Sequence, residues 1–398
     1  MKLKVLIADK LSTAAVESLE SLGAEVRFEP DLSADDLPQA IGPAEVLVVR
    51  STKVTRATIE AGSELSLIVR AGAGVNTIDI EAASESGISV ANCPGRNTAA
   101  VAELAIGLLI AADRRIPAAT ADLLAGRWRK KEYGKAGGLL GRTLGIVGFG
   151  SIGRAVAVRA QALGMHVVVW SRSLTGELAE EANVDLCPTP TDLAARSDAV
   201  SVHLAAAPET RGFIGAPFFA AMREGAIFVN TSRGEIVNPE ALAWAIDKRG
   251  IKVGLDVYPD EPSGGDAAYG NGAFVAKLAA ATPHVGASTD QAAEAIAAET
   301  VRVVASYLET GKPVNAVNIR AKAEEDVSLV VRHHNRVGVL ATVLDELKDA
   351  GINIEEMENT IFQGGTTASC ALKLDKAPDD SRLERIRGAE NVIQVMLK

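Results

Sequence analysis

The stretch TLGIVGFGSIGRAVAVRAQALG, residues 143–164, decides the fold of this chain. A short apolar run is followed by a glycine loop and then by an amphipathic helix, which is the context that a dinucleotide fingerprint requires. Gly148 permits a tight turn, Gly150 lets the backbone approach a pyrophosphate, and Gly153 allows the helix to pack closely on the strand. The N-terminus of the helix favours anions. The stretch predicts a dinucleotide site, with an ordinary βα turn as the weaker alternative, and its residues are Gly148, Gly150, Ser151, Ile152 and Gly153.

The next expected strand, HVVVW at residues 166–170, ends in Ser171 and Arg172 without an acidic residue. Sites that select NAD usually place Asp or Glu there, because the carboxylate binds the ribose hydroxyl and repels a 2′-phosphate. Ser171 removes that repulsion, and Arg172 would bind the phosphate. In the alternative, Arg172 stacks on the adenine or points into water. NAD and NADP both stay open as cofactors, and NADP is expected to be accepted at least comparably with NAD.

Strand and helix patterns alternate on both sides of this stretch. The first part of the chain contains five short strand-like runs, VLIAD, AEVRFE, AEVLVVR, LSLIVRAG and ISVANC. Six parallel strands of doubly wound type are expected in the second part. A long amphipathic pattern after Pro283 has the length to return to the first part. The expected fold class is α/β, with a Rossmann-type cofactor domain at 97–283 and a discontinuous, flavodoxin-like substrate domain at 1–96 and 284–315.

Composition excludes several classes of protein. A net charge of −10 disfavours nucleic acid, which needs a clustered positive surface. The cysteines have neither metal-ligand spacing nor a disulfide pattern, so no metal is expected, and they predict buried thiols in a reducing compartment. They are Cys93, Cys187 and Cys370. Because no run resembles a membrane span or a signal peptide, no membrane association and a cytoplasmic location are expected.

Three residues with chemical potential follow expected strands. Arg233 follows AIFVNTS, Glu261 follows KVGLDVY, and His284 follows LAAAT. Ligands of open α/β sheets bind at the carboxyl ends of strands, so the three are expected to converge. Histidine suits proton transfer near neutrality, a carboxylate would orient the imidazole, and a guanidinium binds a carboxylate in bidentate fashion. Taken singly, each residue has an ordinary loop or surface role as its alternative.

The motifs GFGSIG, NTSRG, LDVYPDEP and TPHVGAST together resemble the D-2-hydroxyacid dehydrogenase family over nearly the whole chain. The resemblance implies that Arg233, Glu261 and His284 are catalytic. It also implies that Asp256 holds the nicotinamide carboxamide. The remaining cofactor-binding residues implied at the strand ends are Thr231, Ser232 and Gly286.

The N-terminal stretches VVRSTKVT, RAGAGVNTID and NCPGRNTAAVAEL resemble those of family members that act on 3-phosphoglycerate. The resemblance implies reversible hydride transfer that yields 3-phosphohydroxypyruvate. A basic stretch with Trp128 and Lys131 resembles the segment that such enzymes extend toward a neighbouring subunit, so a homodimer or homotetramer is expected. The residues implied to bind the substrate's phosphate and carboxylate are Arg50, Gly74, Val75 and Asn97.

After a charged linker, residues 325–398 have the order strand, helix, strand, strand, helix, strand. This βαββαβ order predicts a compact ferredoxin-like domain, and it resembles an ACT domain, a module that binds amino acids. The resemblance implies an L-serine effector site at His333, Asn335 and Asn353, and it favours a role in L-serine biosynthesis.

Two other functions stay open. A glyoxylate or hydroxypyruvate reductase would share the motifs but usually lacks such a tail. A dinucleotide-sensing binding protein on the same scaffold belongs to another class, because fold alone does not fix function. The glycine loop and the three candidate catalytic residues together favour an enzyme.

Overall fold

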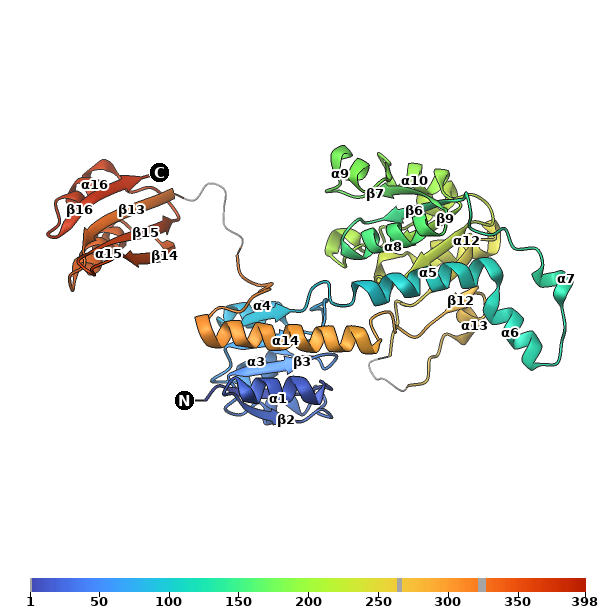
Figure 1. The fold of residues 1–398 in the computed structure, drawn as a ribbon, viewed down its shortest axis with the longest axis horizontal. Coiled ribbons are helices and arrows are strands. Elements are labelled where there is room, and N and C mark those ends of the chain that lie inside the picture. Colours follow the sequence, from blue (N-terminus) through green and yellow to red (C-terminus); the bar gives the residue numbers. More distant parts are fainter. Residues whose placement is uncertain (1, 263–266, 321–326) are drawn as a thin grey trace. The chain divides into compact units, whose positions relative to one another are not determined.

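The computed structural model describes residues 2–262, 267–320 and 327–398. Contacts divide the chain into two units, Met1–Asn318 and Ile319–Lys398, which we treat separately. The first unit contains two parallel sheets, and the second contains a small antiparallel sheet (Figure 1). In the described part of the chain, no helix has the length and apolarity needed to cross a membrane.

All five strands expected in the first part of the chain are present and parallel. Their order is β2-β1-β3-β4-β5, where the strands are β1 (Lys4–Ile7), β2 (Glu25–Phe28), β3 (Val46–Val49), β4 (Leu67–Arg70) and β5 (Ser89–Asn92). Alternate residues of these strands pack into two separate cores. Four helices are inserted between the strands, namely α1 (Thr13–Ser21), α2 (Leu37–Ala40), α3 (Arg56–Ala61) and α4 (Ile80–Glu85).

The long helix α14 (Asp290–Thr310) completes this sheet from far along the sequence. Ile296, Val303 and Val304 of α14 share one core with the buried residues of β1, β3 and β4. Figure 1 shows the helix lying across the sheet, as the length of the amphipathic pattern predicted. The core on this face of the sheet is therefore formed by two segments, the N-terminal strands and the helix α14 near the end of the unit.

The second sheet has seven parallel strands in the order β12-β11-β10-β9-β6-β7-β8. Six were predicted, and the additional strand is β8, whose two residues are too few to show a periodic pattern. The strands are β6 (Thr143–Val147), β7 (His166–Trp170), β8 (Asp185–Leu186), β9 (Ala199–Val202), β10 (Ile227–Asn230), β11 (Lys252–Leu255) and β12 (Ala280–Ala281). Because the chain runs outward from β6 and returns at β9, the switch point of the sheet lies between these two strands.

Helices cover both faces of the second sheet. One core lies under α5 (Thr98–Arg114), α8 (Ser151–Ala162) and α9 (Gly176–Glu181). The other lies under α10 (Pro190–Arg196), α11 (Ala216–Ala221) and α12 (Pro239–Arg249). Asn238 caps α12, because its side-chain oxygen accepts a hydrogen bond from the amide of Ala241 at 2.8 Å.

The second unit confirms the βαββαβ order. Its strand order is β14-β15-β13-β16, all antiparallel. The elements are β13 (Val327–His334), α15 (Val339–Asp349), β14 (Ile354–Ile361), β15 (Thr367–Leu374), α16 (Asp380–Arg387) and β16 (Val392–Leu397). Buried residues alternate along β13 and β15, so one face of the sheet packs against the two helices.

Candidate active site

Arg233, Glu261 and His284 follow three strands that are neighbours in the second sheet. Their strands, β10, β11 and β12, pair in parallel in the order β12-β11-β10. Carboxyl ends of parallel strands lie at the same edge of a sheet, so the three side chains share that edge. The three residues that we expect to converge therefore follow strands that end at one edge of the sheet.

The imidazole of His284 and the carboxylate of Glu261 form a hydrogen bond. Nδ1 of His284 lies 2.5 Å from Oε2 of Glu261, while Oε1 of Glu261 accepts a hydrogen bond from the amide of Tyr258 at 2.8 Å. Burial acts to raise the pKa of Glu261, but these hydrogen bonds and the charge of Arg233 bring it below its ordinary value. An ionised carboxylate thus fixes the ring through Nδ1 and leaves Nε2 for a reacting group.

His284 has a left-handed backbone conformation, with φ of 53°, which is uncommon for a residue with a side chain. Asp256 holds it there. The amide of His284 donates to the carbonyl of Asp256 at 2.8 Å. The buried carboxylate of Asp256 accepts from the Thr282 hydroxyl at 2.7 Å and from the amides of Val285 and Gly286 at 2.9 Å. The family resemblance implies a nicotinamide contact for Asp256, whereas these hydrogen bonds all go to the loop that carries His284.

Arg233 reaches from the second sheet to the loop after β4. A β-carbon on Gly74 would lie 2.5 Å from Nη2 of Arg233, so a side chain at position 74 would displace the end of the guanidinium. Asn230 shapes the turn between β10 and Arg233. Its side-chain amide donates to the Arg233 carbonyl at 2.9 Å, and its oxygen accepts from the Ser232 amide at 3.0 Å. Sequence analysis missed Asn230, although its position at the strand end before an arginine was a usable signal.

Arg50 follows β3 and is positioned by Asp9, which sequence analysis also missed. One oxygen of the Asp9 carboxylate accepts hydrogen bonds from the amides of Arg50 at 2.7 Å, Ser51 at 3.1 Å and Thr52 at 3.0 Å. The Asp9 carboxylate therefore accepts hydrogen bonds from these backbone amides rather than from the Arg50 guanidinium. Asp9 is the last residue of the run VLIAD, whose strand β1 pairs with β3. An acidic residue at the end of a strand was the sequence signal that could have identified Asp9.

The glycine loop fits a dinucleotide pyrophosphate. Gly148 has φ of 95°, and a β-carbon there would lie 2.5 Å from the His203 carbonyl oxygen at the end of β9. A β-carbon on Gly153 would collide with the Gly148 carbonyl. Gly150 has open space beside it and caps α8 without a side-chain hydrogen bond, so the first amides of α8, beginning at Ser151 and Ile152, have no capping side chain. These features suit an anion at a helix N-terminus.

The remaining predicted cofactor residues lie around the same edge. Arg172 is 70% exposed, and its nearest charged partner is the Glu209 carboxylate, 4.0 Å away. Ser171 is partly buried at the end of β7. Thr231 is buried, and its hydroxyl has no hydrogen-bond partner among the described residues. An unpaired buried hydroxyl two residues before Arg233 suits a contact with a bound molecule.

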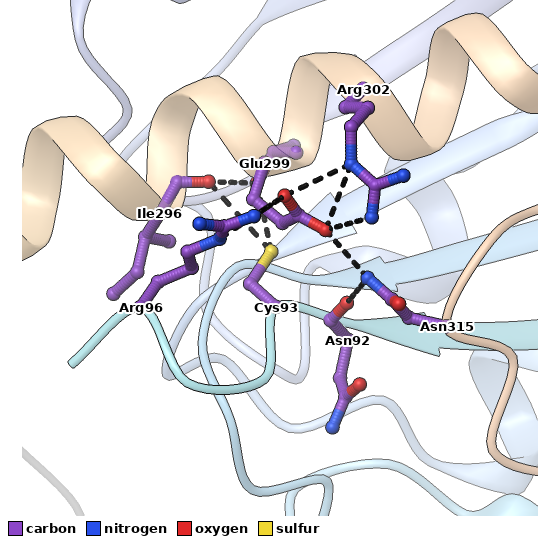
Figure 2. Close-up of polar contacts among 8 residues, drawn as sticks. Asn92, Cys93, Arg96, Ile296, Glu299, Arg302 and Asn315 are labelled. Carbon is purple, nitrogen blue, oxygen red and sulfur yellow. Dashed lines mark hydrogen bonds and ion pairs between the residues drawn. The ribbon is translucent and has the colours of Figure 1, made fainter. Parts of the chain in front are cut away.

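A buried carboxylate anchors the segment before Asn97, the residue that precedes α5. Glu299 of α14 accepts hydrogen bonds from Arg96 at 2.7 Å and from Asn315 at 2.7 Å, and it pairs with Arg302 (Figure 2). These bonds lower the pKa of Glu299 to about 2, with Arg302 as the largest cause. Sequence analysis missed this cluster, which joins residues about 200 positions apart.

The three predicted effector residues do not come together within one chain. His333 is buried, with Nε2 3.3 Å from the Asn359 side-chain oxygen, and Asn335 donates to the Gly365 carbonyl at 2.9 Å. His333 is in register with Ala368, whereas Asn353 precedes the residue that pairs with Leu374, at the opposite end of the sheet. A site that uses all three residues therefore requires more than one copy of the tail.

Comparisons with known proteins agree with this site. Residues 106–286 match the family "D-isomer specific 2-hydroxyacid dehydrogenase, NAD binding domain". The chain is 36% identical over 356 residues to the D-3-phosphoglycerate dehydrogenase of Methanocaldococcus jannaschii, covering 89% of this chain and 67% of that protein. It is 40% identical over 298 residues to the hydroxypyruvate reductase of Thermotoga maritima, covering 74% of this chain and 94% of that protein.

A similar solved structure is that of NAD⁺-bound 3-phosphoglycerate dehydrogenase from Entamoeba histolytica, with a TM-score of 0.67 and 28% identity. The match covers 80% of this chain and 99% of that chain. Sequence, fold and the arrangement of strand-end residues thus lead to the same assignment. The chain belongs to the family of D-isomer-specific 2-hydroxyacid dehydrogenases, enzymes that use a nicotinamide cofactor.

Proposed function

We propose that this chain is a D-3-phosphoglycerate dehydrogenase, which interconverts 3-phosphoglycerate and 3-phosphohydroxypyruvate as the first step of L-serine biosynthesis. The observation that carries the proposal is the approach of Arg233, from the edge that holds Glu261 and His284, to Gly74. The relatives named D-3-phosphoglycerate dehydrogenase support it.

The glycine loop from Gly148 to Gly153 would hold a nicotinamide cofactor, which would supply the hydride acceptor for oxidation at C2 of the hydroxyacid and the hydride donor for the reverse reaction. His284 takes the hydroxyl proton at Nε2 during oxidation and donates it to the carbonyl oxygen during reduction. Glu261 stabilises the protonated imidazole and fixes its orientation through Nδ1. Asp256 keeps the His284 loop in its left-handed conformation, so the proton carrier is preorganised.

The substrate's two anionic ends have separate partners in this proposal. Arg233 binds the carboxylate beside the reacting carbon and polarises the carbonyl, since a guanidinium can make two parallel hydrogen bonds. The amides of Gly74 and Val75, with Asn97, hold the same end. Arg50, whose backbone is fixed by Asp9, binds the phosphate.

Self-association and an L-serine effector are further parts of the proposal. Exposed apolar side chains gather on α6 (Ile116–Leu124) and the segment after it, including Leu124 at 85% and Trp128 at 80% exposure. Apolar surface of this kind suits contact with a second copy, as a homodimer or homotetramer would provide. The ACT-like tail would bind L-serine.

A turnover assay separates this function from its alternatives. Initial rates would be measured with 3-phosphoglycerate, hydroxypyruvate and glyoxylate, each with both nicotinamide cofactors. We expect the highest kcat/KM for the 3-phosphoglycerate couple. A preference for hydroxypyruvate, the compound in the name of the Thermotoga maritima relative, would identify a reductase instead. Cofactor binding without any turnover would identify a binding protein.

A further inference from the structure

The carbonyl of Ala73 and the amide of Gly74 belong to one peptide group in the loop after β4. Because a trans peptide group is planar, its carbonyl oxygen and its amide hydrogen point in opposite directions. The direction of the Ala73 oxygen therefore sets the direction of the Gly74 amide. In the described part of the chain, the amides of Gly74 and Val75 donate no hydrogen bond, so both are available to a ligand.

Asn92, the last residue of β5, holds this peptide group. Its side-chain nitrogen donates a hydrogen bond to the Ala73 carbonyl at 2.6 Å. The amide of the next residue, Cys93, donates to the Gly72 carbonyl at 2.9 Å. Two successive carbonyls of the loop are thus held by the end of β5, which pairs with β4 in the sheet. The sequence motifs assigned no role to Asn92.

The glycine at position 74 makes the hydrogen bond from Asn92 important. A peptide group rotates when the residues on its two sides change conformation together, and glycine accepts positive and negative φ about equally well. Without the Asn92 side chain, the peptide would be free to rotate and to present the Ala73 oxygen in place of the Gly74 amide. A carboxylate and a carbonyl oxygen are both acceptors, so the rotated peptide would repel a carboxylate that the amide would bind.

Asn92 is itself held by residues from the other end of the unit. Its amide donates to the Asn315 carbonyl, and its carbonyl accepts from the Asn315 side chain, each at 3.3 Å. The side-chain nitrogen of Asn315 also donates to the buried carboxylate of Glu299 at 2.7 Å. Figure 2 shows the main-chain oxygen of Asn92 facing Asn315, while the Asn92 side chain points away from this cluster. The main chain of Asn92 is therefore fixed, and its side chain is left for the loop after β4.

We propose that Asn92 is a positioning residue, which orients the peptide between Ala73 and Gly74 so that the Gly74 amide donates to the carboxylate of the substrate. This inference rests on the proposed function and adds to it the group that sets the direction of one substrate ligand. Every 2-hydroxyacid has this carboxylate beside the reacting carbon. The role of Asn92 is therefore independent of a phosphate on the substrate.

Asn92→Asp tests this role, because it keeps the shape of the side chain and replaces the donor by a carboxylate. At about pH 7.5 the aspartate is ionised and repels the Ala73 oxygen. The KM values for hydroxypyruvate and for 3-phosphohydroxypyruvate should rise together, by roughly ten- to a hundredfold, as expected for a lost hydrogen bond to a charged group. The kcat and the Kd for the cofactor should change much less, since the carboxylate is bound equally before and during hydride transfer.

The pH dependence of KM separates this role from a merely structural one. A protonated aspartic acid has an O–H that can donate to the Ala73 carbonyl, as the asparagine amide does. The ratio of KM in Asn92→Asp to KM in the wild type should therefore fall between about pH 7.5 and about pH 5. In Asn92→Ala, which has no donor at any pH, KM should be raised and the ratio should stay constant. A ratio for Asn92→Asp that does not change with pH would contradict the proposal.

Asn318→Asp is the matched control. The side-chain nitrogen of Asn318 donates to the Ile88 carbonyl at 2.8 Å, just before β5, and its other side-chain hydrogen bonds are with Val90 and Ser84. The control therefore loses the same kind of donor from the same strand, and it should leave KM for both substrates unchanged. If Asn92→Asp and Asn318→Asp lower the unfolding temperature alike and neither changes KM, Asn92 has a structural role only and the inference fails.

A crystal structure of the wild type tests the geometry without any substitution. The crystals would contain the oxidised cofactor and hydroxypyruvate, a pair that cannot exchange a hydride at C2. The Gly74 amide should donate to the carboxylate of hydroxypyruvate, while the Ala73 carbonyl stays hydrogen-bonded to Asn92. A Gly74 amide that is directed away from the carboxylate would overturn the inference.

Failure of the inference remains distinguishable from failure of the proposed function. If the wild type prefers hydroxypyruvate to 3-phosphohydroxypyruvate, the proposed function fails, but a raised KM for hydroxypyruvate in Asn92→Asp still supports the role of Asn92. If the wild type prefers the phosphorylated substrate and Asn92→Asp has the wild-type KM for both substrates, the function stands and the inference about Asn92 fails.

Discussion

Nδ1 of His284 and Oε2 of Glu261 lie 2.5 Å apart, although 22 residues separate them in the chain. The pairing brings an imidazole, our proposed proton carrier, and an ionised carboxylate together beyond adjacent strands. Replacing His284 by Ala should reduce kcat by roughly a hundredfold to ten-thousandfold, because a positioned acid or base is lost. Cofactor binding, measured by fluorescence or calorimetry, should be preserved. An alanine variant with near-full turnover would eliminate the assignment.

Glu261→Gln tests the electrostatic part of this pair. Because the pKa of Glu261 lies below its ordinary value, its carboxylate is charged throughout the neutral range and favours the protonated imidazole. The neutral amide removes that effect. The pH above which the reduction rate declines should therefore move to lower pH in the variant. An unchanged pH profile with a lowered kcat would show that Glu261 acts only by orientation.

Cofactor choice depends on the end of β7. Ser171 and Arg172 stand where an NAD-selective enzyme has a carboxylate, and Arg172 is largely free in solvent. We expect the specificity constant for NADP to be at least comparable with that for NAD, and Arg172→Ala to lower the NADP value much more than the NAD value. A wild-type preference for NAD above about a hundredfold, or roughly 2.7 kcal/mol, would contradict the role of Arg172.

The buried Glu299 should make stability depend on pH. Its folded pKa is about 2 and its ordinary value 4.5, so its stabilising contribution is complete above about pH 4.5 and is lost as pH falls toward 2. The shift corresponds to on the order of 3 kcal/mol. Chemical unfolding at pH 7 should show that Glu299→Gln lowers the free energy of unfolding by an amount of this order. The difference in free energy of unfolding between the variant and the wild type should shrink below about pH 4.

A matched control for that experiment is Glu85→Gln. Glu85 forms an exposed ion pair with Arg56, and such surface pairs contribute about 0–1 kcal/mol. Its effect should be small at every pH. If Glu299→Gln and Glu85→Gln lower the free energy of unfolding by the same amount, the proposed anchoring role of Glu299 is wrong. The same conclusion follows if the effect of Glu299→Gln on the free energy of unfolding does not change with pH.

L-serine is expected to bind the ACT-like tail and to inhibit the enzyme. His333 and Asn335 lie at one end of its sheet and Asn353 at the other, so a common site requires two tails. Calorimetry on the full chain with millimolar L-serine should show binding that is accompanied by self-association, and D-serine serves as the control. If no heat is released and activity is unchanged, the tail has an assembly role only.

The elements and the strand-end residues followed from local patterns, because apolar runs, glycine loops and helix caps are encoded within a few positions. The residues that sequence analysis missed act through distant contacts. Asp9 binds the amides after β3, Asn230 shapes the Arg233 turn, and Glu299 joins segments about 200 residues apart. Strand β8 was missed because its two residues carry no pattern.

The most direct measurement of the central claim follows the hydride itself. D-3-phosphoglycerate deuterated at C2 would be incubated with the enzyme and oxidised cofactor, with the ketoacid trapped, and the reduced cofactor would be examined by NMR. The account predicts deuterium at C4 of the nicotinamide ring, at a rate that His284→Ala reduces at least a hundredfold. Absence of label in the reduced cofactor, with the enzyme shown to be folded and to bind that cofactor, would contradict it.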